Sequence, residues 1–123
     1  MPTIKLNAAP LALTTKYATE ESVDVWLSHY TPSGRLALII KTTAGEPMHT
    51  GSVNLPSEEC PRDEVFVKNW GENEGVAKFL MVNDILSLKI EAHVPTGNVV
   101  ALRCKFHASV QPQVEEYLRE NNL

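Results

Sequence analysis

The chain has 123 residues, of which 43% are hydrophobic and 21% are charged, and this composition predicts one soluble globular domain spanning residues 1–123 rather than a disordered chain. Eleven Lys and Arg stand against fifteen Asp and Glu, so the formal net charge is −4, and the basic residues are scattered. A duplex-binding surface needs clustered basic residues to displace counterions from phosphates, so this charge pattern argues against direct binding of nucleic acid.

The sequence also argues against a membrane partner. No apolar run approaches the roughly 18 residues that a membrane-spanning helix needs. The N-terminal residues 1–5 lack the charged segment followed by an apolar stretch that marks a secretion signal. We therefore expect a cytoplasmic protein, in which Cys60 and Cys104, which form no CxxC pair, remain thiols.

The first half of the chain has the pattern of strands joined by turns. Val23, Val25 and Leu27 alternate with polar residues and predict a strand at 22–30. Trp26 then lies on the less buried face, where it either packs under another element or contacts a partner. A turn is expected at 31–34, and further strands are expected at 3–6, 11–17, 35–42 and 48–55. The segment 35–42 is apolar on both faces, which predicts the central strand of a meander.

A strand, a turn and a helix follow in the middle of the chain. After a proline-containing loop at 56–62, we expect a buried strand at 64–70, a glycine-punctuated turn at 71–75 and a helix at 76–82. Asn73 is the predicted N-cap of this helix because its side chain can accept hydrogen bonds from first-turn amides, and Glu74 complements the helix dipole. The helical spacing places Val76, Phe79 and Leu80 in the core.

The last third predicts a β-hairpin and a second helix. Apolar residues alternate along both strands and should face the core: Leu86, Leu88, Ile90, Ala92 and Val94, then Val100, Leu102, Cys104 and Phe106. A helix is expected at 112–121, with Ser109 as a candidate cap, and its apolar stripe consists of Val114, Tyr117 and Leu118. The predicted fold class is α+β, a mainly antiparallel sheet of about six or seven strands with two helices in a single domain.

No pattern for metal binding is complete in the sequence. The four histidines, at positions 29, 49, 93 and 107, have no second ligand at helical metal spacing. This spacing favours surface histidines, and the alternative is a metal site assembled from distant strands. The glycines at 71 and 75 do not fit a phosphate-binding loop, because the Lys-Ser or Lys-Thr that should follow is absent. We therefore predict no metal and no cofactor.

Nucleophilic catalysis is also not favoured. Cys60 lies among carboxylates, which should raise its pKa and make it a poor nucleophile. Cys104 falls on the apolar face of its strand and is expected in the core. We predict no catalytic residue; convergence of His49, Glu58, Cys60 and Asp63 in one deep pocket would favour an enzyme instead.

The middle of the chain resembles an uncharacterised family of small bacterial proteins. The resemblance rests on Val53-Asn54-Leu55-Pro56 and on Lys68, Glu72, Asn73 and Gly75 before a helix, an NLP…K-x-x-x-E-N-x-G pattern. It covers residues 30–106, including the later hairpin, although Trp70 and Gly71 depart from the pattern. Such proteins are similar to accessory products of phages, plasmids and conjugative elements. The resemblance implies no enzyme activity. It favours an interaction protein encoded by a mobile element, a class that includes proteins that block a host defence system such as CRISPR.

The favoured hypothesis is a non-enzymatic protein-binding module, a monomer or homodimer, whose acidic surface meets a basic nucleic-acid-binding effector complex. Its affinity should then fall steeply with added salt. The candidate contact residues, each with capping or packing as its alternative role, are Trp70, Glu72, Asn73, Glu74, Trp26 and Tyr30. The alternatives are an enzyme with an unrecognised site or a homo-oligomeric maintenance domain that pairs through strand edges of the N-terminal meander.

Overall fold

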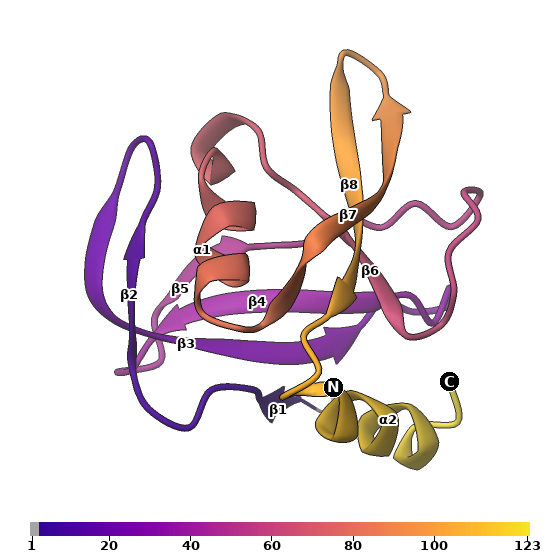
Figure 1. Ribbon diagram of the computed structural model, residues 1–123, viewed down its shortest axis with the longest axis horizontal. Helices are drawn as coiled ribbons and strands as arrows, with labels where there is room; N and C mark the ends of the chain where they lie inside the picture. The colour runs from indigo at the N-terminus through magenta and orange to yellow at the C-terminus, as the bar shows by residue number, and fades with distance from the viewer. Residues whose placement is uncertain (1–2) are drawn as a thin grey trace.

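The computed structural model describes residues 3–123, which form two antiparallel sheets with helices packed beside them (Figure 1). The first sheet has the order β1-β3-β4-β5, with β2 also paired to β3. Its strands are β1 (Ile4–Lys5), β2 (Leu11–Thr14), β3 (Thr19–His29), β4 (Leu36–Thr42) and β5 (Pro47–Thr50). The second sheet has the order β6-β8-β7, with β6 (Glu64–Val67), β7 (Leu86–Thr96) and β8 (Val99–Phe106). The helical segments are η1 (Gly71–Asn73), a 3-10 turn, α1 (Val76–Val82) and α2 (Gln111–Glu120).

The predicted α+β class is confirmed, with eight strands in the described residues and two sheets instead of one. Strand β4 lies between β3 and β5, so the prediction of a central strand is also confirmed. Val25 and Leu27 of β3 and Leu38 of β4 are fully buried. These three side chains share a core-facing side of the sheet because residues two apart on a strand point the same way.

The strand expected at 48–55 ends early, at Thr50 of β5. The next residues, 51–53, leave the first sheet and join the second. The amide of Gly51 donates to the carbonyl of Leu38 in β4 at 2.8 Å, and the amide of Lys68 donates to the carbonyl of Gly51 at 3.0 Å. Ser52 lies opposite Val67 in an isolated antiparallel bridge. The segment 51–53 therefore bonds to both sheets.

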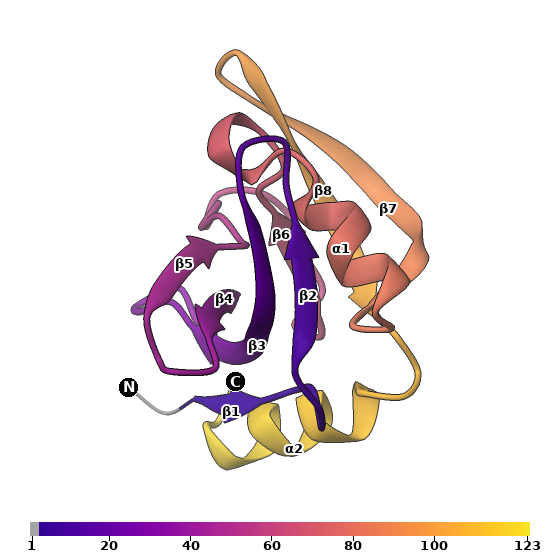
Figure 2. The same ribbon diagram turned by 90° about the vertical axis from the view of Figure 1, so that its left-hand side faces the viewer.

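The helices close the core from two sides. Helix α1 lies between β2 and β7 (Figure 2) and buries Val76, Phe79 and Leu80, as predicted. Helix α2 crosses the molecule below β1 and β3 in Figure 1, and it buries its predicted stripe: Val114, Tyr117 and Leu118. One hydrophobic cluster contains side chains from both sheets and both helices. Within residues 3–123, no helix combines the length and apolarity needed to cross a bilayer.

The predicted cap of α2 is wrong. Val110 occupies the N-cap position and no side chain caps this helix end. The Ser109 hydroxyl instead interacts with Nδ1 of His107 at 2.8 Å and donates to the carbonyl of Asp84 at 3.2 Å. Ser109 thus joins the segment before α2 to the turn after α1.

The hairpin of β7 and β8 is confirmed, but the predicted alternation of β7 fails at Leu88, which is 78% exposed. Between Leu86 and Ile90 the chain advances four residues in β7, whereas their partners in β8, Phe106 and Cys104, are only two apart. The extra residues form a bulge, which changes the direction of the side chains within it. Val100 on β8 is also more exposed than predicted, at 44%, close to the hairpin tip that projects from the body.

Candidate protein-binding surface

Four of the six candidate contact residues lie in the loop 68–75, which connects β6 to α1. Strand β6 ends at Val67 rather than at the predicted Trp70, and η1 then turns the chain. Glu72 and Glu74 are exposed and Trp70 is half-buried. The loop therefore presents two carboxylates and part of an indole ring to solvent.

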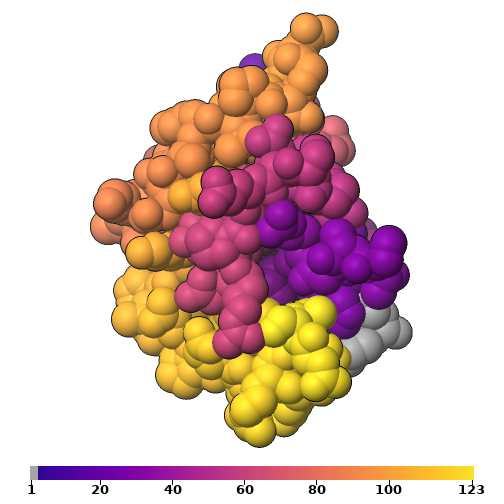
Figure 3. All heavy atoms as spheres, turned by 90° about the vertical axis from the view of Figure 1, so that its right-hand side faces the viewer, coloured from indigo at the N-terminus to yellow at the C-terminus, as the bar shows by residue number. Residues whose placement is uncertain are grey.

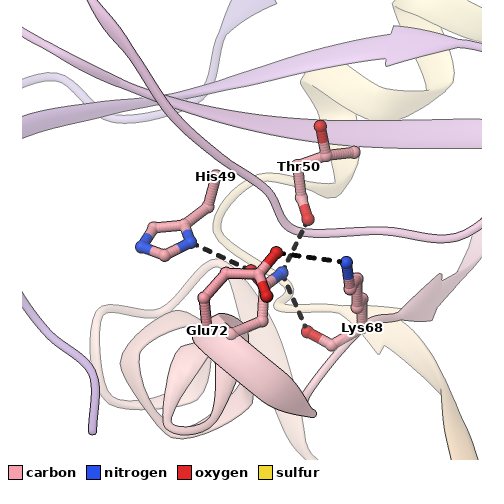
Figure 4. A network of polar contacts seen from close by, with 5 residues as sticks. His49, Thr50, Lys68 and Glu72 are labelled. Atoms are coloured by element: carbon pink, nitrogen blue, oxygen red, sulfur yellow. Dashed lines mark hydrogen bonds and ion pairs between the residues drawn. The ribbon is translucent and has the colours of Figure 1, made fainter. Parts of the chain in front are cut away.

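The side-chain amide of Asn73 bonds this loop to β5, and Figure 4 shows its partners His49, Thr50 and Lys68. Its amide nitrogen donates to the backbone carbonyls of Thr50 at 2.7 Å and Lys68 at 3.3 Å. These two acceptors fix the orientation of the amide, so its oxygen accepts from Nδ1 of His49 at 2.9 Å. Neutral His49 therefore carries its proton on Nδ1 and a lone pair on Nε2. Asn73 itself is only 1% exposed, so the prediction that it contacts a partner is wrong, and its role is to position the loop.

The cap of α1 comes from Asn69, not from the predicted Asn73. The side-chain oxygen of Asn69 accepts from the backbone amides of Gly75 at 3.2 Å and Ala77 at 2.9 Å. These amides are among those that an α-helix leaves without intrahelical partners. Gly75 occupies the N-cap position and has no side chain to offer. The prediction failed because the amide of Asn73 is already bonded to the strand side of the loop.

The C-terminal end of the loop is held by the turn between β2 and β3. The amide of Lys16 donates to the carbonyl of Glu74 at 2.9 Å. Gly75 has φ of 106°, and a Cβ atom there would lie 3.2 Å from Cα of Thr15, closer than real Cβ contacts normally come. Only glycine permits this approach without strain. The loop is therefore fixed both by β5 and by the β2–β3 turn.

Each exposed glutamate of the loop is paired with a lysine. Glu72 lies 3.4 Å from Nζ of Lys68, and Glu74 lies 3.4 Å from Nζ of Lys16. A hydrogen bond from its own backbone amide, and then Lys68, lower the pKa of Glu72, and the hydrogen bond to Glu74 raises the pKa of Lys16. The same Lys68 lies 6.0 Å from the ring centroid of Trp70, within cation–π range. The two ion pairs make the loop locally neutral.

Trp26 and Tyr30 lie outside the loop. Trp26 is half-buried on β3, opposite Ile39 of β4, and Nζ of Lys41 lies 5.7 Å from its ring centroid. Tyr30 follows the end of β3, and its hydroxyl bonds to the Ser52 hydroxyl at 2.9 Å. Tyr30 therefore has a packing role at the segment that joins the sheets, while Trp26 remains partly accessible on a sheet face.

The four side chains whose convergence would favour an enzyme do not share the groove that Cys60 lines. Cys60 lines a groove of about 330 Å³, and neither His49, Glu58 nor Asp63 lines it. The Arg35 guanidinium donates to the carbonyls of Cys60 at 2.7 Å and Glu58 at 2.6 Å, which orders this loop. The loop that contains Cys60 and Arg62 (magenta) lies against the C-terminal residues (yellow) in Figure 3. Arg62 donates to the main-chain oxygen of Leu123 there at 2.6 Å.

The pKa values of both thiols are raised, which disfavours the reactive thiolate form. Burial is the main cause that raises the pKa of Cys60. Glu64 and Asp63 also raise this pKa, but each contributes less than Arg35, which lowers it. The adjacent Glu58 and Glu59, which the sequence suggested as the cause, are not among the groups that shift it. Burial raises the pKa of Cys104 to about 12, in agreement with its predicted place in the core. Among residues 3–123, no group of three or more histidine, cysteine or acidic side chains is arranged to hold a metal ion.

The fold and the loop together define a small α+β protein with two antiparallel sheets and an exposed loop that the side-chain amides of Asn69 and Asn73 hold in place. Comparisons with protein-family models, with curated proteins and with solved structures find no match. The resemblance of residues 30–106 to accessory proteins of mobile elements therefore stays a prediction.

Proposed function

We propose that the protein is a non-enzymatic protein-binding module and that it contacts its partner through Trp70, Glu72 and Glu74 of the loop 68–75. One observation carries this proposal: the loop is exposed, yet asparagine side chains bond its backbone at both ends. A loop that is already ordered loses little conformational entropy when a partner binds. A partly exposed tryptophan supplies the kind of side chain that most often dominates binding energy at interfaces.

The local ion pairs alter the expected salt dependence. Lys16 and Lys68 neutralise Glu74 and Glu72, so a partner does not meet a surface of one charge sign. Binding at this loop should therefore depend mainly on Trp70 and on hydrogen bonds to the carboxylates, and it should weaken only modestly with added salt. This modest effect of salt on affinity replaces the steep decrease in affinity that the sequence suggested. The net charge of −4 still favours encounter with a basic protein at low salt.

We further propose that the partner is a basic, nucleic-acid-binding effector complex of a host defence system. This step is supported by the resemblance of residues 30–106 and by the acidic net charge. In this function the protein occupies a site on the complex and prevents its action without chemistry of its own. The same binding mode fits a mobile-element protein that engages another cellular complex, and the experiment below distinguishes the two.

The test is affinity capture from a host lysate with three forms of the tagged protein. The wild type should recover one defined complex, and Trp70→Ala combined with Glu72→Gln and Glu74→Gln should lose it. Glu46→Gln combined with Glu59→Gln is the matched control, because both carboxylates are exposed and lie outside the loop. Recovery of a defence nuclease would support the anti-defence role, and recovery of another complex would support only binding. Equal capture by all three forms would exclude the loop as the contact surface.

A further inference from the structure

Strand β7 is the unpaired edge of the second sheet. The order β6-β8-β7 gives each sheet edge a different environment. Beside β6, the amide of Val53 donates to the carbonyl of Phe66 at 3.0 Å, and Ser52 bridges to Val67. The other long side of β7 has no paired strand among residues 3–123, and β7 forms the right-hand border of the molecule in Figure 2. An unpaired edge is a template for another strand.

The same edge exposes apolar surface. Leu88, in the bulge, is 78% exposed, and Val82 at the end of α1 is 62% exposed. Both line a groove of about 740 Å³ that also contains Met81 and Phe106. An isolated exposed leucine needs no explanation, but exposed apolar side chains beside an open strand edge are typical of an interaction site.

Strand β7 carries a positive and a negative side chain that can pair with the same two side chains of a second copy. Lys89 and Glu91 flank Ile90, and neither forms an ion pair with another side chain of residues 3–123. In an antiparallel pair centred on Ile90, the backbone of Lys89 in one copy lies opposite that of Glu91 in the other, and the two-fold axis repeats this contact. The register of β7 is irregular on both sides of Ile90, so the pairing relies on the long, flexible side chains of Lys89 and Glu91 rather than on strict alternation. Shifting the centre by one residue, to Glu91, would instead oppose two identical carboxylates.

We propose that β7 pairs with β7 of a second copy of this chain around a two-fold axis at Ile90, and that this pairing forms a homodimer. A two-fold interface requires one surface to complement itself, and the Lys89-Ile90-Glu91 run meets this condition. The pairing places the dimer contact in the second sheet, not in the N-terminal meander. It uses a surface distinct from the loop 68–75, so it does not depend on the proposed function.

The proposed dimer is tested by reversing the charges of Lys89 and Glu91, singly and together. Lys89→Glu alone and Glu91→Lys alone each replace two attractive contacts with two repulsive ones, and each should weaken dimerisation by roughly tenfold or more. The double exchange, Lys89→Glu with Glu91→Lys, restores opposite charges and should recover dimerisation. Lys5→Glu is the matched control, because Lys5 is exposed on β1 of the other sheet and should leave dimerisation unchanged.

Analytical ultracentrifugation measures the association, and circular dichroism confirms that each variant is folded. The wild type should show a concentration-dependent dimer, with dissociation in the micromolar range that is typical of a small interface. A wild type that stays monomeric up to about 1 mM would overturn the proposal, and the bulges would then protect the edge from pairing. A dimer that tolerates both single variants would also overturn it, because β7 would not be its contact.

Discussion

Replacing Asn73 with alanine tests the internal support of the loop 68–75. The substitution removes three hydrogen bonds, to the carbonyls of Thr50 and Lys68 and to Nδ1 of His49. Each bond contributes about 1 kcal/mol. Water can compensate in part because Thr50 is exposed and His49 and Lys68 are half-buried, so we expect a loss of about 2 kcal/mol in the free energy of unfolding. For a chain of this size, that loss lowers Tm by roughly 8 °C.

Urea unfolding followed by circular dichroism measures this loss, and an unchanged slope would indicate that the unfolded state is not affected. Asn73→Asp is the matched variant. It keeps an acceptor for His49, loses both donors and places a carboxylate oxygen against the carbonyls of Thr50 and Lys68. It should cost at least as much as Asn73→Ala. A loss below about 0.5 kcal/mol for either variant would refute the assigned role of this amide.

Four further outcomes test the surroundings of the loop and the core. Asn69→Ala should lower the free energy of unfolding by about 1 kcal/mol because α1 loses its cap, and Asn69→Asp, which keeps an acceptor, should restore most of it; equal losses would contradict the capping role. Gly75→Ala should lower Tm more than Gly45→Ala: both have positive φ, but only at Gly75 would Cβ meet neighbouring backbone, so equal Tm values would contradict the close approach. In the folded protein at pH 8, Cys60 should react slowly with a thiol reagent and Cys104 only after unfolding; rapid reaction of two thiols would contradict the burial of Cys104. The pKa of Cys104 is about 12 when folded against an ordinary 9.0, so the unfolded chain loses this proton first and stability falls as pH rises from about 9 toward 12. Urea unfolding across this pH range should show a steeper fall for the wild type than for Cys104→Ala, and parallel curves would contradict it.

The elements that the sequence predicted well are those in which local pattern and core packing agree. Helix α1 spans the predicted Val76–Val82 because its apolar face is regular and Asn83 ends it. Strand β7 was misjudged at Leu88, because strict alternation assumes an unbroken ladder and the bulge depends on how β7 pairs with β8. A periodic sequence carries no information about such a register shift.

The position of the loop 68–75 could be predicted from the sequence, but most of its contacts could not. The glycines at 71 and 75 marked the loop, and the spacing of Lys68 and Glu72, four residues apart, could have indicated their ion pair. Two asparagines were available to cap α1, and local preference alone could not choose between them. The pairing of Lys16 with Glu74 joins residues far apart in the sequence, so only the packing of the β2–β3 turn against the loop reveals it.

The segment 51–53 links the unfolding of the two sheets. Its backbone is bonded to β4 on one side and to the start of the loop 68–75 on the other. Neither sheet can separate from the other without breaking these bonds, so the two sheets should unfold as one cooperative unit. In hydrogen exchange, the amides of Gly51 and Lys68 should therefore exchange as slowly as those at the centre of β3. Exchange at these two positions through a smaller local opening would indicate that the sheets come apart one at a time.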